Sequence, residues 1–156
     1  RPFIDAIKKV GFDLTNSTSL TFSGGVGAGG YNGELAADDT NIYILDTTTT
    51  IQKYSISGTT ATFVSTITLN NAIDLNDGGF HWDGTSFYGS TIASGVIRIF
   101  NSAGTQTSTI AISSATEQIR GLFIDNGVLW TGFFLPTSDG VGTISTASAQ
   151  LIPIFL

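Results

Sequence analysis

The chain has 156 residues, of which 41% are apolar, 12% are charged and none is cysteine. This length and apolar share predict a single domain with its own core, and the missing cysteine excludes disulfides and thiolate metal sites. The formal net charge is −6, with only six Lys and Arg, which argues against a nucleic-acid partner. No apolar run reaches the roughly 18 residues of a membrane-spanning helix, so membrane insertion is not expected.

The first 33 residues are the least regular part of the sequence. Residues 1–33 are expected to form N-terminal strands and a glycine-rich connector. Residues 2–10 fit either a short helix or a strand, whereas 12–14 and 20–22 are predicted strands. The glycine-rich run 24–30 spaces its glycines like a phosphate-binding loop, but neither a helix-forming segment nor the lysine of a P-loop follows it. We therefore interpret this run as a connector.

A repeated phrase organises the rest of the chain. Residues 35–38, 80–83 and 122–125 each end in Asp and lead into a turn, which is followed by an apolar strand with an aromatic residue. The aspartates lie 45 and 42 residues apart (Asp38, Asp83 and Asp125), which is the length of one four-stranded propeller blade. The repeats predict three units, over 34–78, 79–120 and 121–156.

Each unit is expected to contain four short strands that end at turn-forming residues. Lys53 and Arg98 are also 45 residues apart, which supports the same repeat length. Pro153 cannot donate a hydrogen bond to a neighbouring strand, so the last strand is predicted at a sheet edge or against a partner. The predicted strands are 34–37, 42–45, 51–56 and 63–69, then 79–82, 87–92, 96–100 and 107–112, and finally 121–124, 128–135, 141–146 and 151–156.

This pattern of four strands per unit, with Asp or Gly at the first turn and an aromatic second strand, resembles the β-propeller repeats of NHL-like and YVTN-like proteins. The resemblance covers roughly residues 34–156. It implies an all-β fold, a β-propeller-like array of about three four-stranded blades plus N-terminal strands. The signatures of WD40 repeats and of sialidase Asp-boxes are absent, so no activity is implied.

Three blades do not close a ring, because propellers typically have 4–8. Four ways of completing the array are open. The N-terminal strands could form a small fourth blade, or further polypeptide could supply the missing ones, since the chain lacks an initial Met and is expected to be processed or truncated. Self-association could also complete the ring, or the blades could stack as an open array.

The longer, irregular segments 70–78, 113–120 and 136–140 are expected on one face of the array, with the links between blades and the turns after each second strand. Variable loops commonly carry binding, so this face is the predicted ligand-binding face. The candidate ligand-binding residues are Asn70, Asp74, Asn76, Asp77, Glu117, Arg120 and Trp130.

Each chemical hypothesis has a structural alternative. Asp74, Asn76 and Asp77 offer oxygen ligands for Ca²⁺, but the spacing suits Asx turns better. His81 is the only histidine, so we expect it to line a channel or pack rather than to bind metal. Glu117 and Asp139 are the conceivable acid pair of a glycosidase. No metal, cofactor or catalytic residue is assigned.

Aromatic side chains are the remaining candidates for ligand contact. Trp82, Tyr88 and Trp130 either stack against sugar rings or fill the space between blades. Trp130 aligns with Tyr43 and Tyr88 in the second strand of each unit, which favours packing between blades.

The amino-acid composition indicates where the protein works, and the functional prediction starts from that location. Ser and Thr make up roughly a quarter of the chain, about twice the usual share, and such lysine-poor, hydroxyl-rich chains are typical of extracellular or virion surfaces. We therefore predict a non-enzymatic structural or binding module, comparable to a spike, tail fibre or adhesin. Its expected partners are further copies of itself, neighbouring subunits, or a cell-surface receptor or glycan. A carbohydrate-active hydrolase and a glycan-binding lectin are the alternatives.

Overall fold

The computed structural model of the chain describes residues 8–10, 17–25, 34–74, 78–91, 95–111, 118–125, 127–135, 138–145 and 150–154. All regular structure within these residues is β-strand, which confirms the predicted all-β class. In the same residues there is no helix with the length and apolar character needed to cross a membrane.

Three four-stranded antiparallel meanders form the body of the molecule, and in each meander consecutive strands are neighbours. We call them blades 1, 2 and 3. Blade 1 contains β4 (Leu35–Ala37), β5 (Asn41–Thr47), β6 (Thr50–Ser57) and β7 (Thr60–Thr68); blade 2 contains β8 (Phe80–Trp82), β9 (Ser86–Thr91), β10 (Val96–Asn101) and β11 (Gln106–Ala111); blade 3 contains β12 (Gln118–Asp125), β13 (Val128–Leu135), β14 (Ser138–Ser145) and β15 (Gln150–Ile154).

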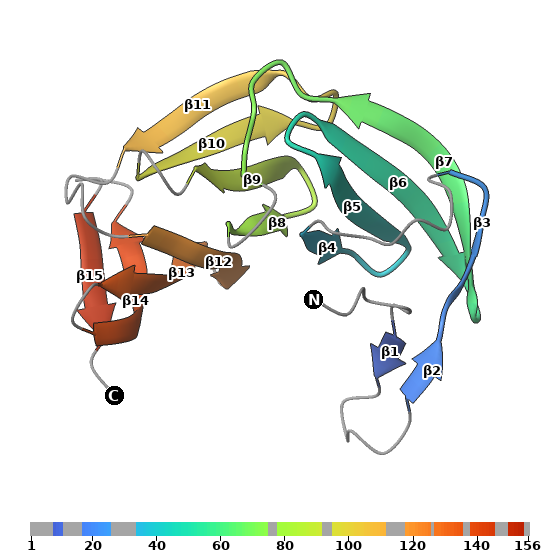
Figure 1. Cartoon of the computed structure of the whole chain (residues 1–156), viewed down its shortest axis with the longest axis horizontal. Coiled ribbons are helices and arrows are strands. Elements are labelled where there is room, and N and C mark those ends of the chain that lie inside the picture. Colours follow the sequence, from blue (N-terminus) through green and yellow to red (C-terminus); the bar gives the residue numbers. More distant parts are fainter. Residues whose placement is uncertain are drawn as a thin grey trace.

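The blades follow one another around an arc, with β4, β8 and β12 on its inner side (Figure 1). The inner strand β8 contacts both β4 and β12, so the blades meet at their first strands. Blade 3 lies at one end of the arc and the N-terminal strands lie at the other (Figure 1).

One of the three N-terminal strands adds to blade 1, and the other two form a separate sheet. β1 (Lys8–Val10) pairs antiparallel with β2 (Ser17–Ser19), so the end of the ambiguous segment 2–10 is strand. β3 (Thr21–Ser23) pairs in parallel with β7 and becomes the fifth strand of that sheet. The predicted strand 12–14 and most of the glycine-rich run lie outside the described residues.

Blade 3 differs from its prediction in two strands. The first begins at Gln118 rather than at Gly121, and the third begins at Ser138 rather than at Val141, so residues 138–140 are strand and not part of the expected loop 136–140. Gly121 has a positive φ of 71°, and the pairing with β13 shifts register between Arg120 and Leu122. A glycine that resembles a boundary in the sequence is therefore a bulge inside a longer strand. The last strand, β15, lies at the edge of its sheet, as Pro153 predicted.

The core lies between blades. The first cluster joins blade 1, with Tyr43 and Leu45, to blade 2, with Phe80, Trp82 and Phe87. A second, smaller cluster joins blade 2 to blade 3 and contains Ile97, Leu122 and Leu129, with Tyr88, Ile110 and Ile124 packed against it.

Two glycines allow this close packing. A Cβ at Gly79 would lie 2.7 Å from the carbonyl carbon of Gly121, so Gly79 lets the inner strands of blades 2 and 3 approach. A Cβ at Gly89 would collide with the side chain of Ile73, which comes from the link between blades 1 and 2. The link is thereby seated directly on the second strand of blade 2.

Candidate functional site

The repeated aspartates close the first turn of blades 1 and 2. Asp38 Oδ1 accepts the backbone N–H groups of Thr40 (2.8 Å) and Asn41 (2.7 Å), and its Oδ2 accepts the hydroxyl of Tyr43 (3.2 Å). One carboxylate thus fixes both the turn and the aromatic side chain five residues later.

Asp83 in blade 2 repeats this arrangement. Its Oδ1 accepts the N–H groups of Thr85 and Ser86, both at 2.7 Å, and its Oδ2 accepts the hydroxyl of Tyr88 at 3.0 Å. These carboxylates are saturated by their own hairpins, so we assign them to the fold rather than to ligand binding.

The pKa values agree with this structural role. Partial burial alone would raise the pKa of Asp38, but the hydrogen bonds from Thr40 and Asn41 outweigh it and lower that pKa to about 2. Burial, together with the adjacent carboxylate, raises the pKa of Tyr43 and that of Tyr88 to about 12. Each aspartate is therefore charged and each tyrosine neutral at ordinary pH.

Tyr43 and Tyr88 also reach into the next blade. The Tyr43 ring lies 5.1 Å from the rings of both Trp82 and Phe87, which belong to blade 2. Tyr88 packs against the cluster that contains Leu122 of blade 3. Trp82 and Tyr88 thus contribute to packing between blades. This is the second of the two roles predicted for them from the sequence, the first being to stack against sugar rings.

His81, on the inner strand of blade 2, forms a polar contact with blade 3. Its Nε2 accepts the backbone N–H of Ile124 at 3.3 Å, which requires the neutral ring with the proton on Nδ1. Burial lowers the pKa of His81, although the carboxylate of Asp83 acts in the opposite direction. The single histidine is therefore half-buried between two blades.

Trp130 occupies the position of Tyr43 and Tyr88 in blade 3, but it lies at the end of the array. Leu122 and Leu129 face blade 2, so side-chain alternation places Phe123, Val128 and Trp130 on the opposite side of blade 3. We call these three residues the trailing surface.

The trailing surface is apolar, with Phe123 and Val128 exposed and Trp130 partly buried. Trp130 stacks on Phe123, with ring centroids 5.9 Å apart and an interplanar angle of 5°. Phe123 remains 48% exposed and Val128 41% exposed. Trp130 Nε1 has no hydrogen-bond partner among the described residues, so blade 3 lacks the bond from aromatic residue to aspartate that blades 1 and 2 form.

The other end of the array exposes the matching side of blade 1. Leu35 and Ala37 alternate with Ala36, which is buried toward blade 2, and both are exposed, Leu35 by 42%. We call Leu35 and Ala37 the leading surface. The equivalent residues of blade 2, Phe80 and Trp82, are buried against blade 1.

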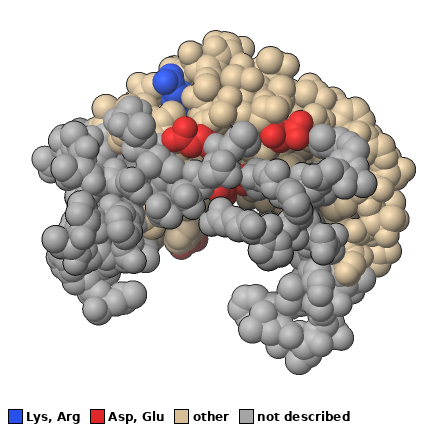
Figure 2. All heavy atoms as spheres, in the orientation of Figure 1, with Lys and Arg blue, Asp and Glu red and all other residues tan. Residues whose placement is uncertain are grey.

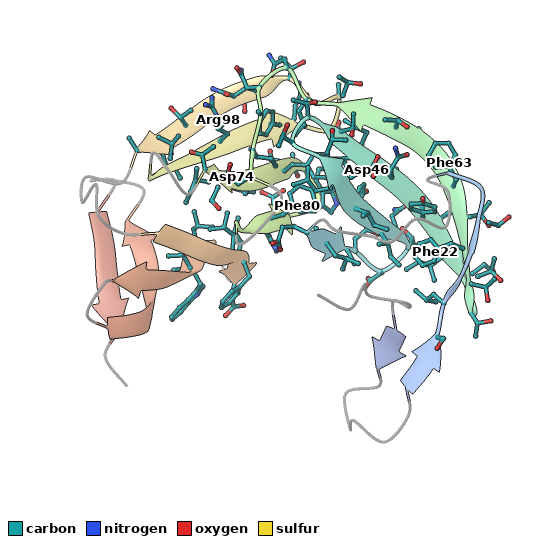
Figure 3. All side chains as sticks on the ribbon, viewed as in Figure 1. Phe22, Asp46, Phe63, Asp74, Phe80 and Arg98 are labelled. Carbon is teal, nitrogen blue, oxygen red and sulfur yellow. The ribbon has the colours of Figure 1, made fainter. Side chains whose placement is uncertain are left out.

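The outer part of the same side of blade 1 is covered by the N-terminal segment. Leu20 packs with the buried residues Ile42, Ile44 and Tyr54, and Phe22 meets the ring of Tyr54 at 4.9 Å, edge to face. Figure 3 shows Phe22 at this end of the array, beside β3 and β7.

Two of the predicted ligand-binding residues lie in the link between blades 1 and 2. The Oδ1 atom of Asn70 accepts the N–H of Gln106 (2.8 Å), and its own N–H donates to the carbonyl of Gly104 (3.1 Å), so Asn70 fastens the link to blade 2. The N–H of Asp74 donates to the carbonyl of Ser90 at 3.1 Å. In Figure 3, Asp74 and Asp46 lie apart.

Two more of the predicted residues lie on neighbouring strands of blade 3. Arg120 pairs through its backbone with Gly132 on β13, two residues from Trp130. Asn76, Asp77 and Glu117 lie outside the described residues, so the suggested calcium site and acid pair remain predictions. Among the residues that the structure does describe, no three His, Asp or Glu side chains form a group that could hold a metal.

The sequence interpretation missed Phe123, Val128 and Leu35. Phe123 is equivalent to Ala36 of unit 1 and His81 of unit 2, so the repeat pattern did not predict a large apolar aromatic side chain at this position. The available signal was the replacement of the polar Asn41 and Ser86 by Val128 at the equivalent position.

No family model and no curated protein sequence matches this chain. Among solved structures, the glutaminyl cyclase of Myxococcus xanthus resembles it with a TM-score of 0.56 and 16% identity, over 76% of this chain and 49% of that one. BamB from Moraxella catarrhalis has a TM-score of 0.48 and 16% identity, over 82% of this chain and 41% of that chain. A europium-containing methanol dehydrogenase has a TM-score of 0.46 and 11% identity, over 78% and 25%.

The resemblance to the cyclase defines the fold. That structure is of the β-propeller type, and the successive four-stranded meanders of blades 1 to 3 are the units of such a fold. The chain spans about half the length of the cyclase that it resembles. This protein therefore has a β-propeller fold.

Proposed function

We propose that the chain is a non-enzymatic structural or binding module of an extracellular or virion surface, comparable to a spike, tail fibre or adhesin. The observation that carries this proposal is the trailing surface of Phe123, Val128 and Trp130. Tyr43 of blade 1 is buried under blade 2, whereas here Phe123 is 48% exposed and stacks on the partly buried ring of Trp130. Contiguous apolar surface of this kind usually marks a contact with another macromolecule.

The surface composition supports the proposed location. Only 12% of the residues are charged, and the described surface in Figure 2 shows few charged groups among other residues. Solubility then depends on Ser, Thr, Asn and Gln side chains. Such a surface suits a module that works outside the cell or on a particle.

Protease treatment of intact source cells or particles tests this location. We expect peptides from blades 1 and 2 to be released before the cells or particles lyse, as detected by mass spectrometry. A cytosolic marker protein that stays intact serves as the control. Release of these peptides only after lysis would contradict the proposed location.

Glycan binding is the second candidate function, and the exposed ring of Phe123 favours it. A flat aromatic stack can hold the apolar face of a sugar ring. Neutral oligosaccharides should then quench or shift the fluorescence of Trp130, while Trp82 stays buried. A Phe123→Ser variant that responds to the oligosaccharides as strongly as the unchanged chain would argue against this candidate. The hydrolase alternative depends on Glu117 and Asp139, and no observation favours it.

A further inference from the structure

We propose that the trailing surface of one copy of this chain binds the leading surface of a second copy, so that chains join head to tail. This inference rests on the proposed structural function and names the partner of the open surface. The contact would repeat between chains the way in which one blade meets the next within a chain.

The first argument is that the junction between blades follows one rule, seen twice. In blade 1, Tyr43 points toward blade 2 and packs on Trp82 and Phe87. In blade 2, Tyr88 packs toward blade 3, against the cluster with Leu122. The aromatic residue five positions after the repeated aspartate therefore covers the inner strands of the following blade.

The second argument is that both halves of this junction are exposed at the ends of the array. Trp130 and Phe123 offer the aromatic half on blade 3, and Leu35 and Ala37 offer the receiving half on blade 1. Among the side chains whose exposure the structure describes, the exposed large hydrophobic ones are Leu35, Val64, Phe123 and Val128. All but Val64 belong to the two surfaces, and none of the residues in either surface is charged.

The third argument concerns space. The arc leaves its two ends apart (Figure 1), and the chain covers about half of a propeller-type protein of similar fold. Leu20 and Phe22 cover the outer strands of blade 1 but leave Leu35 exposed on the inner strand. A second copy can therefore contact Leu35 without displacing Leu20 or Phe22.

Light scattering coupled to size exclusion tests the proposal with one variant for each surface. The unchanged chain should give a mass above the 16.3 kDa of one copy. Phe123→Asp and Leu35→Asp should each weaken association by about tenfold or more, as expected when a central apolar contact receives a charge. Val64→Asp is the matched control, because Val64 is 51% exposed on β7 but belongs to neither surface, and it should leave the mass unchanged.

Mixing the two variants gives the sharpest result. The Leu35→Asp chain keeps an intact trailing surface, and the Phe123→Asp chain keeps an intact leading surface. A head-to-tail contact predicts that the mixture forms a pair that neither variant forms alone. Circular dichroism verifies that both variants fold, and Leu35→Ser and Phe123→Ser replace any variant that does not.

Any of the following results would overturn the proposal. A monomeric unchanged chain at about 100 µM would mean that another polypeptide or further blades cover the trailing surface. If Leu35→Asp associates as fully as the unchanged chain, two trailing surfaces meet instead. A mixture of Leu35→Asp and Phe123→Asp that forms no pair would have the same meaning. A monomeric chain that is still released by protease from intact cells or particles would overturn self-association while keeping the proposed function.

Discussion

At the scale of single residues, the first turn of blade 1 and that of blade 2 each depend on one carboxylate. Replacing Asp38 by Ala removes the acceptor for Thr40, Asn41 and Tyr43 together. We expect the free energy of unfolding at neutral pH to fall by about 1–2 kcal/mol, since hydrogen bonds to a charged group are lost. Denaturant unfolding measures this change, with the exposed neighbour Asp39→Ala as the control.

The same carboxylate gives an acid dependence with a defined sign. The pKa of Asp38 is about 2 in the folded chain, below its ordinary value of 3.8. The stability that it contributes is therefore present above about pH 4 and is lost as the pH falls toward 2. The difference between the unchanged chain and Asp38→Ala should shrink over this interval, and a constant difference would contradict the assignment.

His81 gives a second acid dependence, at the junction of blades 2 and 3. Burial lowers its pKa below 6.5, so the unfolded chain takes up a proton before the folded chain does as the pH falls. Stability should therefore decline as the pH falls through about 6.5 toward the lower pKa of the folded chain. His81→Gln should flatten this decline, because a glutamine oxygen can still accept the Ile124 N–H but does not titrate.

The chain contains one histidine, so its ring signals can be followed directly by NMR titration. Tyr88, whose ring lies 6.4 Å away, and the carboxylate of Asp83 are the described titratable groups close to it. A measured pKa at or above 6.5 would show that the carboxylate dominates over burial.

At the scale of elements, the link between blades 1 and 2 packs directly on β9 because Gly89 has no side chain. A Cβ at Gly89 would meet the Cδ1, Cγ2 and Cβ atoms of Ile73. Gly89→Ala should therefore lower the free energy of unfolding by about 1–3 kcal/mol through overpacking. Ile73→Val removes the Cδ1 atom, so the double variant should lose less stability than the sum of the single variants. Additive losses in denaturant unfolding would contradict this contact.

The elements that sequence reasoning predicted best are those with a short-range physical signal. Repeated aspartates and alternating apolar residues define most strands of blades 1 and 2 to within a residue or two, because turn chemistry and strand periodicity are local. The bulge at Gly121 was not predictable in this way. A glycine with positive φ can either end a strand or form a bulge within it. Only the pairing with β13 shows that Gly121 forms a bulge.

Equal spacing in sequence also does not guarantee equal pairing. Lys53 and Arg98 are 45 residues apart, but Lys53 pairs with Tyr43 whereas Arg98 pairs with Gly89. The register of β5 shifts between Leu45 and Thr47, so the two cations have different neighbours. Lys53 Nζ lies 5.6 Å from the centroid of the Tyr43 ring as a result.

At the scale of the whole molecule, the candidate surface was less predictable than the fold. Phe123 and Leu35 have the same apolar character as the buried residues of blade 2, and nothing in their local sequence marks them as exposed. Their exposure arises because blades 1 and 3 each have one side with no neighbouring blade among the described residues. The polar ligand-binding candidates were chosen instead because they lie in irregular loops. One of them, Asn70, uses its side chain for a hydrogen bond within the fold.

The net charge of the molecule makes the head-to-tail contact testable by ionic strength. Each copy carries a formal charge of −6, so two copies repel one another at low salt, while the proposed contact between Leu35 and the Phe123–Trp130 stack contains no ion pair. Salt shortens the reach of this repulsion from about 30 Å at 0.01 M to about 3 Å at 1 M, and it leaves apolar attraction in place. Association measured by sedimentation velocity should therefore strengthen as salt rises, and Val64→Asp, which adds one negative charge, should show a slightly steeper rise. Weaker association at high salt would instead mean that charged groups hold the copies together, which would place the contact away from these two apolar surfaces.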